Sequence, residues 1–235
     1  HLPVRVPLGM ALAAGQHSVE HPRIFLFECY RGAAEFRALP DPIAAYTTDM
    51  RLRFIDEHDS VRCAERMAAM AASDTWWTPT LQVLRMSALA GNREFREDPR
   101  RRYIPYILWA GLWQPDADRA AAHARHASGR DVDAELYRLA MDNVRQAHAA
   151  GVRIVAGTDA GDTYVFPGFA IHDELAELVR AGLAPADALR SATIDAARFS
   201  GKAREYGSIE VEKVADMILL DANPLTDIRS TEKIA

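Results

Sequence analysis

Asp159 is the residue whose type and position most clearly suggest chemistry. It lies in the turn Gly157–Gly161, directly after the short apolar run 153–156. A carboxylate at the carboxyl end of a buried parallel strand must give up hydration, which costs free energy. In barrel enzymes such a carboxylate meets a metal, a base or a substrate. The alternative is an ordinary turn aspartate whose side chain caps the next turn.

Two histidines, His1 and His21, are also expected at strand ends and are candidate metal ligands together with Asp159. Imidazole nitrogen and carboxylate oxygen suit Zn²⁺ and neighbouring divalent ions. A metal bound this way lowers the pKa of a water molecule to about 7, and a nearby carboxylate can accept its proton. The alternatives are a hydrogen-bonded structural histidine at position 21 and a frayed chain end at position 1. His123 and His126 lie in a polar, Ala- and Arg-rich segment and are expected on the surface.

Composition places the chain among ordinary globular proteins. It has 235 residues, of which 49% are hydrophobic and 26% charged, and a net charge of −5. This charge gives no case for nucleic acid or an anionic membrane, and no apolar run reaches the roughly 18 residues of a spanning helix. The basic run 100–102 follows acidic residues and is expected to be solvated. Cys29 and Cys63 are expected to be small apolar residues in or near helices, without a disulfide framework or a Cys-rich zinc site.

The pattern of short apolar runs and amphipathic segments predicts a parallel α/β fold. Helices are expected at 3–15, 42–57, 59–73, 81–90, 131–150 and 169–181, with another from Pro185 and an irregular, mostly helical excursion over 91–130. Strands are expected at 18–21, 75–80 and 153–156. The apolar run 215–220 falls outside this alternation and predicts a separate small β structure.

These motifs, in this order, resemble the amidohydrolase superfamily, and most closely its imidazolonepropionase-like or prolidase-like branch. His1-Leu2-Pro3 and Ser18-Val19-Glu20-His21 resemble the segment joining barrel strands five and six. The resemblance covers nearly the whole chain, and its further motifs are Trp77–Leu81, Ala150–Gly161, Phe166–Phe169, His172–Leu175, Gly182–Leu189, Gly207–Asp221 and Asn223–Leu225.

The resemblance implies the C-terminal half of a (β/α)₈ TIM barrel, strands 5/6 to 8, plus a returning segment of a small β-sandwich. The barrel part would be residues 1–205 and the sandwich part 206–235. The chain departs from the family at Val211-Glu212-Lys213, where Pro-Gly-Lys is usual, which suggests a different turn. It also has no match to the family's first-strand His-x-His pair and bridging lysine. The natural N-terminus is therefore expected to be missing, and either another segment or self-association would complete the barrel.

The implied function is hydrolysis of an amide-type C–N bond in a dipeptide, an N-acyl amino acid or a cyclic amide. His1, His21 and Asp159 would bind a divalent metal, most simply Zn²⁺, and Asp159 would accept the proton of the attacking water. His172 and Tyr164 are candidates for contacting the small-molecule substrate. The alternatives are a non-catalytic, self-associating scaffold and a metal-dependent lyase or isomerase on the same barrel. The compartment stays open, with the cytoplasm as the default.

Overall fold

A three-stranded parallel sheet organises the chain, which the computed structural model describes over residues 1–235. The strands are β1 (Ser18–Glu20), β2 (Trp76–Thr78) and β3 (Arg153–Ile154), hydrogen-bonded in the order β1-β2-β3. Val19 pairs with Trp77, which in turn pairs with Ile154. All three strands lie where the sequence predicts them, although each is shorter. Because the strands are parallel, their carboxyl ends meet at one edge of the sheet.

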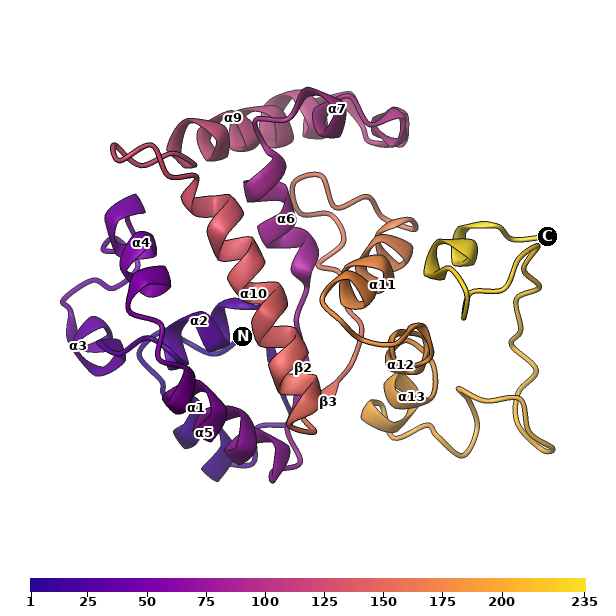
Figure 1. The fold of residues 1–235 in the computed structure, drawn as a ribbon. Coiled ribbons are helices and arrows are strands. Elements are labelled where there is room, and N and C mark those ends of the chain that lie inside the picture. The colour runs from indigo at the N-terminus through magenta and orange to yellow at the C-terminus, as the bar shows by residue number, and fades with distance from the viewer.

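Helical segments make every connection between these strands. Helix α1 (Leu8–Ala13) precedes β1, and α10 (Val132–Ala149) runs through the middle of the molecule beside α6 (Leu81–Leu89) (Figure 1). The connection from β1 to β2 contains α2 (Arg23–Glu28), α3 (Ala33–Ala38), α4 (Thr48–Asp56) and α5 (Ser60–Ala71). The connection from β2 to β3 contains α6 (Leu81–Leu89), α7 (Arg93–Arg96), η1 (Pro99–Tyr103), α8 (Tyr106–Leu108), η2 (Trp109–Trp113), α9 (Gln114–His123) and α10 (Val132–Ala149). After β3 come α11 (Ala170–Arg180), α12 (Pro185–Ser191), α13 (Ile194–Phe199) and η3 (Ile228–Glu232).

Helix α10 shows how local sequence sets these elements. The side chain of Asp131 accepts a hydrogen bond from the Ala134 N–H at 3.0 Å and caps the N-terminus, as the sequence predicts. Its apolar stripe includes the buried Leu136, Ala140 and Val144, which recur at helical spacing and join the main hydrophobic core. That core also contains Trp77 of β2, so the helix and the sheet share one buried interior. None of the helices combines the length and the apolar character that a membrane span requires.

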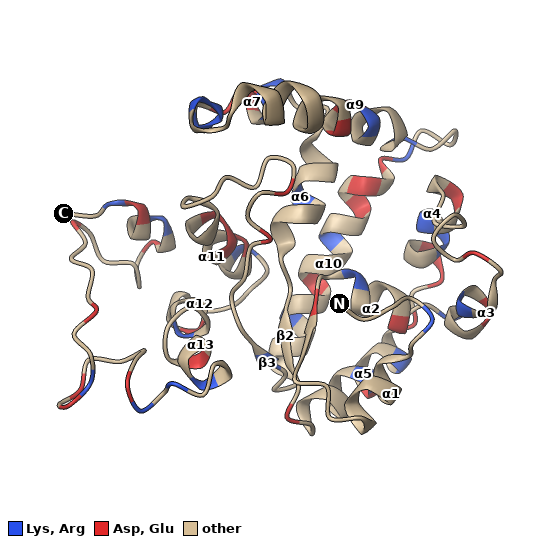
Figure 2. Ribbon diagram, turned by 180° about the vertical axis from the view of Figure 1, so that it is seen from behind, with Lys and Arg blue, Asp and Glu red and all other residues tan.

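Charged residues of both signs are spread over the helices, which the view from behind shows along α4 and α9 (Figure 2). Arg100, from the basic run of the sequence, forms ion pairs with Asp98 and Asp173, each at 2.7 Å. Arg101 and Arg102 are exposed, as the sequence predicts, whereas Arg100 is only 23% exposed between its two partners.

Cys29 and Cys63 are buried in or beside helices, as the sequence predicts, but the expectation that they form no disulfide is wrong. Cys29, at the C-terminal end of α2, and Cys63 of α5 form a disulfide, with their Cα atoms 4.5 Å apart. The two helices pack against each other, which brings together residues 34 positions apart. Sequence spacing alone carries no signal for such a contact.

The predicted strand at 215–220 is also wrong. Only Leu220 makes a β-type contact, a single bridge to Ile234, and Met217, Ile218 and Leu219 are more than half exposed. A strand requires a neighbour to satisfy its backbone groups, and no other strand lies beside this run. The segment extends away from the body (Figure 1) and returns through η3, which contacts α11 and buries Ile228.

Two helices begin later than the sequence predicts. The helix expected from residue 3 begins at Leu8, after Pro7, and the helix expected from residue 42 begins at Thr48. There the Thr47 side chain accepts a hydrogen bond from Met50 N–H. The N-cap at Thr47 therefore sets where this helix begins. The spacing of apolar residues alone does not indicate that position.

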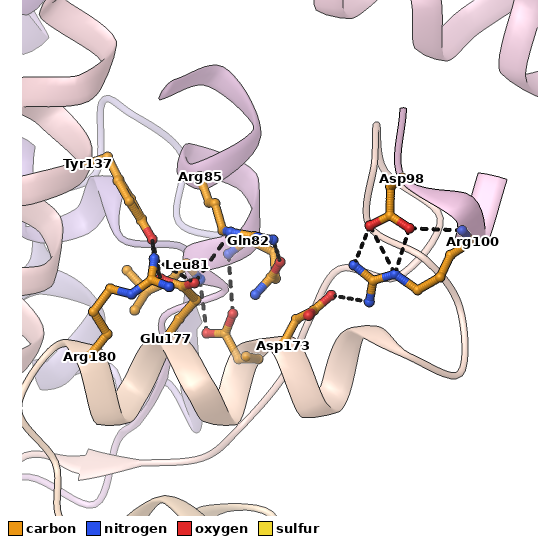
Figure 3. Close-up of polar contacts among 10 residues, drawn as sticks. Leu81, Gln82, Arg85, Asp98, Arg100, Tyr137, Asp173, Glu177 and Arg180 are labelled. Carbon is orange, nitrogen blue, oxygen red and sulfur yellow. Dashed lines mark hydrogen bonds and ion pairs between the residues drawn. The ribbon is translucent and has the colours of Figure 1, made fainter. Parts of the chain in front are cut away.

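Glu174 of α11 caps the N-terminus of α6 from outside that helix. Its carboxylate is fully buried and accepts hydrogen bonds from the backbone N–H groups of Leu81, at 2.9 Å, and Gln82, at 3.2 Å. On the next turn of α11, Glu177 pairs with Arg85, Arg180 and the Tyr137 hydroxyl (Figure 3). Burial raises the pKa of Glu174 to about 8, although the two N–H donors favour the charged form.

We predict that Glu174 makes the fold less stable as pH rises. Its pKa is raised from an ordinary value of 4.5, so its contribution is complete below about pH 4.5 and is lost as pH rises through about 8. We compare the unfolding free energies of the native chain and of Glu174→Gln. The advantage of the native chain should decrease across this pH window, by at most about 1.4 kcal/mol per pH unit. Urea unfolding at a series of pH values measures it. Parallel pH profiles for the two proteins would contradict the prediction.

Candidate functional site

The carboxyl edge of the sheet carries three residues in an unusual backbone conformation. His21 follows β1, Thr80 follows β2 and Asp159 follows β3, with φ angles of 73°, 45° and 56°. Residues with side chains rarely adopt positive φ, and a β-branched residue such as threonine does so least readily. Such conformations cost on the order of 1–3 kcal/mol each and cluster at functional sites. The strained positions therefore mark this edge as the candidate site.

Strand β2 holds the backbone of His21 on both sides. The His21 N–H donates to the Thr78 carbonyl at 2.9 Å, and the His21 carbonyl accepts from Trp77 Nε1 at 3.0 Å. Trp77 is completely buried, so its indole is a fixed donor. These two hydrogen bonds determine the left-handed conformation of His21 and the direction in which its ring leaves the chain.

Thr80 orients the imidazole ring of His21. Its Oγ1 lies 2.9 Å from His21 Nδ1. Although Thr80 is the N-cap residue of α6, its side chain makes no capping hydrogen bond, and Glu174 caps the helix in its place. The hydroxyl is thus available to the histidine. A partner on Nδ1 leaves Nε2 as the nitrogen that can bind a ligand.

His1 and His21 meet through their Nε2 atoms. The two nitrogens lie 3.2 Å apart, and the rings meet edge to face with centroids 4.5 Å apart. Two nitrogens bound to one tetrahedral Zn²⁺ at 2.0–2.1 Å would be about 3.4 Å apart. The N-terminal amine of His1 also forms an ion pair with Glu20 at 3.1 Å. The pair of imidazoles therefore fits a shared divalent cation.

Asp159 lies on the opposite side of the His21 ring. Its Oδ2 is 3.9 Å from His21 Nδ1, and its side chain is 44% exposed. The ligand atoms of His1, His21 and Asp159 do not all lie within 4.8 Å of one another. Burial lowers the pKa of His21, against the opposing charge of Asp159, so that the ring is neutral as a ligand must be. The structure thus joins His1 to His21 and brings Asp159 near His21 at the second ring nitrogen.

The two candidate substrate residues have different surroundings. Tyr164 is 3% exposed in a small aromatic cluster, with its ring 5.6 Å from that of Trp113 and 6.2 Å from that of Phe166. His172 lies in the first turn of α11, and its Nδ1 is buried without a hydrogen-bond partner. The neighbouring Asp173 is held by Arg100 (Figure 3).

Sequence reasoning missed the roles of Thr80 and Glu174. Thr80 was expected to end the strand at 75–80, where Pro79 stops regular pairing. Proline at that place is the one available signal that the next residue leaves the strand geometry. No sequence signal connects Glu174 with a helix terminus 92 positions earlier, because only tertiary packing brings them together.

A cavity of about 640 Å³ opens at the other end of the sheet. It is lined by Trp76 and Arg153, the first residues of β2 and β3, and by residues of α12 and α13. Since parallel α/β enzymes bind ligands at the carboxyl ends of their strands, we assign the candidate site to the opposite edge.

The turn before Asp159 packs tightly against β2. A Cβ atom at Gly157 would overlap Cγ2 of Thr78. Glycine is therefore required here for close approach, and this contact fixes the height of the Gly157–Gly161 turn above the sheet.

Comparison with known proteins places these features in a family. The amidohydrolase family profile matches residues 111–234. A solved Bottromycin amidohydrolase is similar at 27% identity with a TM-score of 0.61, over 86% of this chain and 40% of its own. A Xaa-Pro dipeptidase with methionine bound in its active site shares the fold at 23% identity and a TM-score of 0.50, over 97% of this chain and 39% of its own. No curated protein matches. The chain thus spans well under half the length of these two structures.

We predict that Gly157→Ala destabilises the chain by about 1–3 kcal/mol, because the added methyl overlaps the Thr78 methyl. The matched control is Thr78→Ser, which removes that methyl and keeps the hydroxyl. Gly157→Ala made in the Thr78→Ser background should lose most of its cost, which a double-mutant cycle of urea unfolding measures. An equal cost in both backgrounds would show that the contact does not limit the turn.

Proposed function

The chain belongs to the amidohydrolase family, and from this premise we propose that its parent protein is a hydrolase of amide-type C–N bonds. The observation that carries the proposal is the approach of His1 Nε2 to His21 Nε2 at 3.2 Å, at the carboxyl edge of a parallel sheet. We extend the proposal to the same substrate classes that the sequence suggests: a dipeptide, an N-acyl amino acid or a cyclic amide.

His1 and His21 would hold a divalent cation between their Nε2 atoms. We favour Zn²⁺ because imidazole nitrogen with an oxygen ligand is a common zinc donor set. A cation bound there would polarise the scissile carbonyl and acidify a water molecule. Thr80 keeps the His21 ring in the tautomer with Nε2 free, and burial keeps that ring neutral.

Asp159 would accept the proton of the attacking water at a carboxylate oxygen. Its exposed side chain and its position 3.9 Å from His21 Nδ1 support a role at this edge. To serve also as a ligand, its carboxylate would turn toward the Nε2 side of His21. In the proposed site, His172 at the start of α11 is the candidate substrate contact. Because Tyr164 is buried among aromatic rings, we assign it to the packing of the fold and not to substrate contact.

We propose that the three strands form part of a (β/α)₈ barrel. Their parallel order, with helical connections between them, supports this architecture. In this proposal residues 1–205 are the barrel part and residues 206–235 return to a small β-sandwich. The exposed apolar side chains of Ile209, Val211 and Leu219 support a further segment that covers them.

The second candidate function is a non-catalytic, self-associating scaffold. The same exposed apolar residues favour it, since two copies could cover them. Sedimentation of the chain together with a hydrolysis screen of the parent protein separates the two. A monodisperse oligomer without hydrolysis in any form would support the scaffold.

We predict that Asp159→Asn in the parent protein lowers kcat for amide hydrolysis by about 10²–10⁴-fold with the fold unchanged, because the amide cannot accept the proton. The matched control is Asp162→Asn, a neighbouring exposed carboxylate on the same loop. That variant should retain near-native kcat. Steady-state kinetics with circular dichroism measures both, and native turnover by Asp159→Asn would refute the role of Asp159.

A further inference from the structure

A second group of metal-binding side chains lies away from the carboxyl edge of the sheet. Cys29 ends α2, Cys63 belongs to α5, and His58 lies in the connection between α4 and α5. One ligand atom from each of the three lies within 4.8 Å of the other two. Both cysteines are completely buried. This group shares no residue with the candidate hydrolase site.

Backbone pairing fixes His58 beside Cys29. The Asp59 N–H donates to the Cys29 carbonyl at 2.8 Å, and Arg31 N–H donates to the Glu57 carbonyl at 3.1 Å. Tyr30 and His58 form the antiparallel bridge between these two contacts. These backbone contacts place His58 beside Cys29 without involving either sulfur atom, and the packing of α2 on α5 brings Cys63 to the same place.

We propose that Cys29, His58 and Cys63 bind a thiophilic divalent metal ion, such as Zn²⁺, when the disulfide is reduced. Two thiolates and one imidazole form three of the four positions of a tetrahedral zinc site. Sulfur ligands also select such ions over hard cations such as Mg²⁺ and Ca²⁺.

Two buried polar atoms around the group have no hydrogen-bond partner. One is His58 Nδ1, and the other is Nδ2 of Asn143 on α10. An unsatisfied buried polar atom is unfavourable, so it calls for an explanation. A metal ion would satisfy a His58 nitrogen directly.

The Asn143 amide suits a thiolate better than it suits a disulfide. Its Oδ1 lies 3.6 Å from Cys63 Sγ, but a disulfide sulfur has no hydrogen to donate to that oxygen. Turning the amide by 180° exchanges oxygen and nitrogen and directs an N–H toward the sulfur. A metal-bound thiolate accepts such a hydrogen bond, and contacts of this kind support metal ligands.

The charges around His58 also favour a cation. Asp142 of α10 and Asp59 act on His58 with negative charge, while burial lowers its pKa and keeps the ring neutral for metal binding. The proposal stands on the convergence of the three ligands and on the two unpartnered atoms, and these charges add to it.

The disulfide and the metal site exclude each other. A two-electron reductant, such as a dithiol or a phosphine, converts the disulfide into two thiols with the uptake of two protons. Both protons leave again when the thiolates bind the metal. Oxidation with loss of two electrons restores the S–S bond and releases the ion.

Cobalt(II) added to the phosphine-reduced protein under anaerobic conditions tests the proposal, because thiolate ligands give a charge-transfer band that histidine and carboxylate ligands do not. We expect a band that saturates at one equivalent per chain. Cys63→Ser should abolish it, and His58→Gln should weaken binding at least about tenfold. The matched control His123→Gln changes an exposed histidine and should leave the band unchanged. The unreduced protein should show no band.

If reduction partly unfolds the chain, circular dichroism measures whether the metal ion restores the native fold. Recovery of the native spectrum on adding Zn²⁺, lost in His58→Gln, would support the site. The absence of a band in the reduced native chain, or an equal band in His58→Gln, would overturn the proposal. A reduced chain that stays unfolded with metal would overturn it as well.

Discussion

The hydrogen bonds between β2 and His21 are the constraint on which the candidate site depends. Trp77 and Thr78 hold the histidine backbone on both sides, and Thr80 holds its ring, so three nearby residues of one segment position one imidazole. These hydrogen bonds hold His21 in a left-handed backbone conformation. They offset the free-energy cost of that conformation. Glu174 belongs to the same arrangement, since its cap of α6 leaves the Thr80 hydroxyl to the histidine. The chemistry at the edge therefore depends on packing that reaches from α11 to β1.

The sequence predicted most elements because their signals are local. Asp131 as a cap and the stripe of Leu136, Ala140 and Val144 located α10, and β-branched and aromatic residues located β2. The sequence does not indicate which other residues each site residue contacts. Nothing in the sequence distinguishes a threonine that orients a histidine from one that caps a helix, and Cys29 and Cys63 meet only through the packing of α2 on α5. The run at 215–220 fails for a related reason: its composition fits a strand, but pairing requires a neighbour that this chain does not present to it.

The two candidate metal sites rest on different observations. At the carboxyl edge, His1 and His21 approach at a separation that fits a shared ion, and the family supplies the chemical context. Around Cys29, the family provides no chemical context. The proposed metal site there rests on three converging ligands and on two buried polar atoms that have no hydrogen-bond partner. In the first site the partner of the imidazole is Thr80, and in the second the nitrogen of His58 has none.

In the proposed metal site Thr80 orients His21 as a ligand, and the zinc affinity of the parent protein is the direct test of that role. Chelator competition should be measured for the native protein, for Thr80→Val and for Thr80→Ser, which keeps the hydroxyl. We predict a loss of affinity of about 10–100-fold in Thr80→Val, as is typical when a hydrogen-bond partner of a ligand is removed, and near-native affinity in Thr80→Ser. Equal affinity in all three proteins would contradict the central claim.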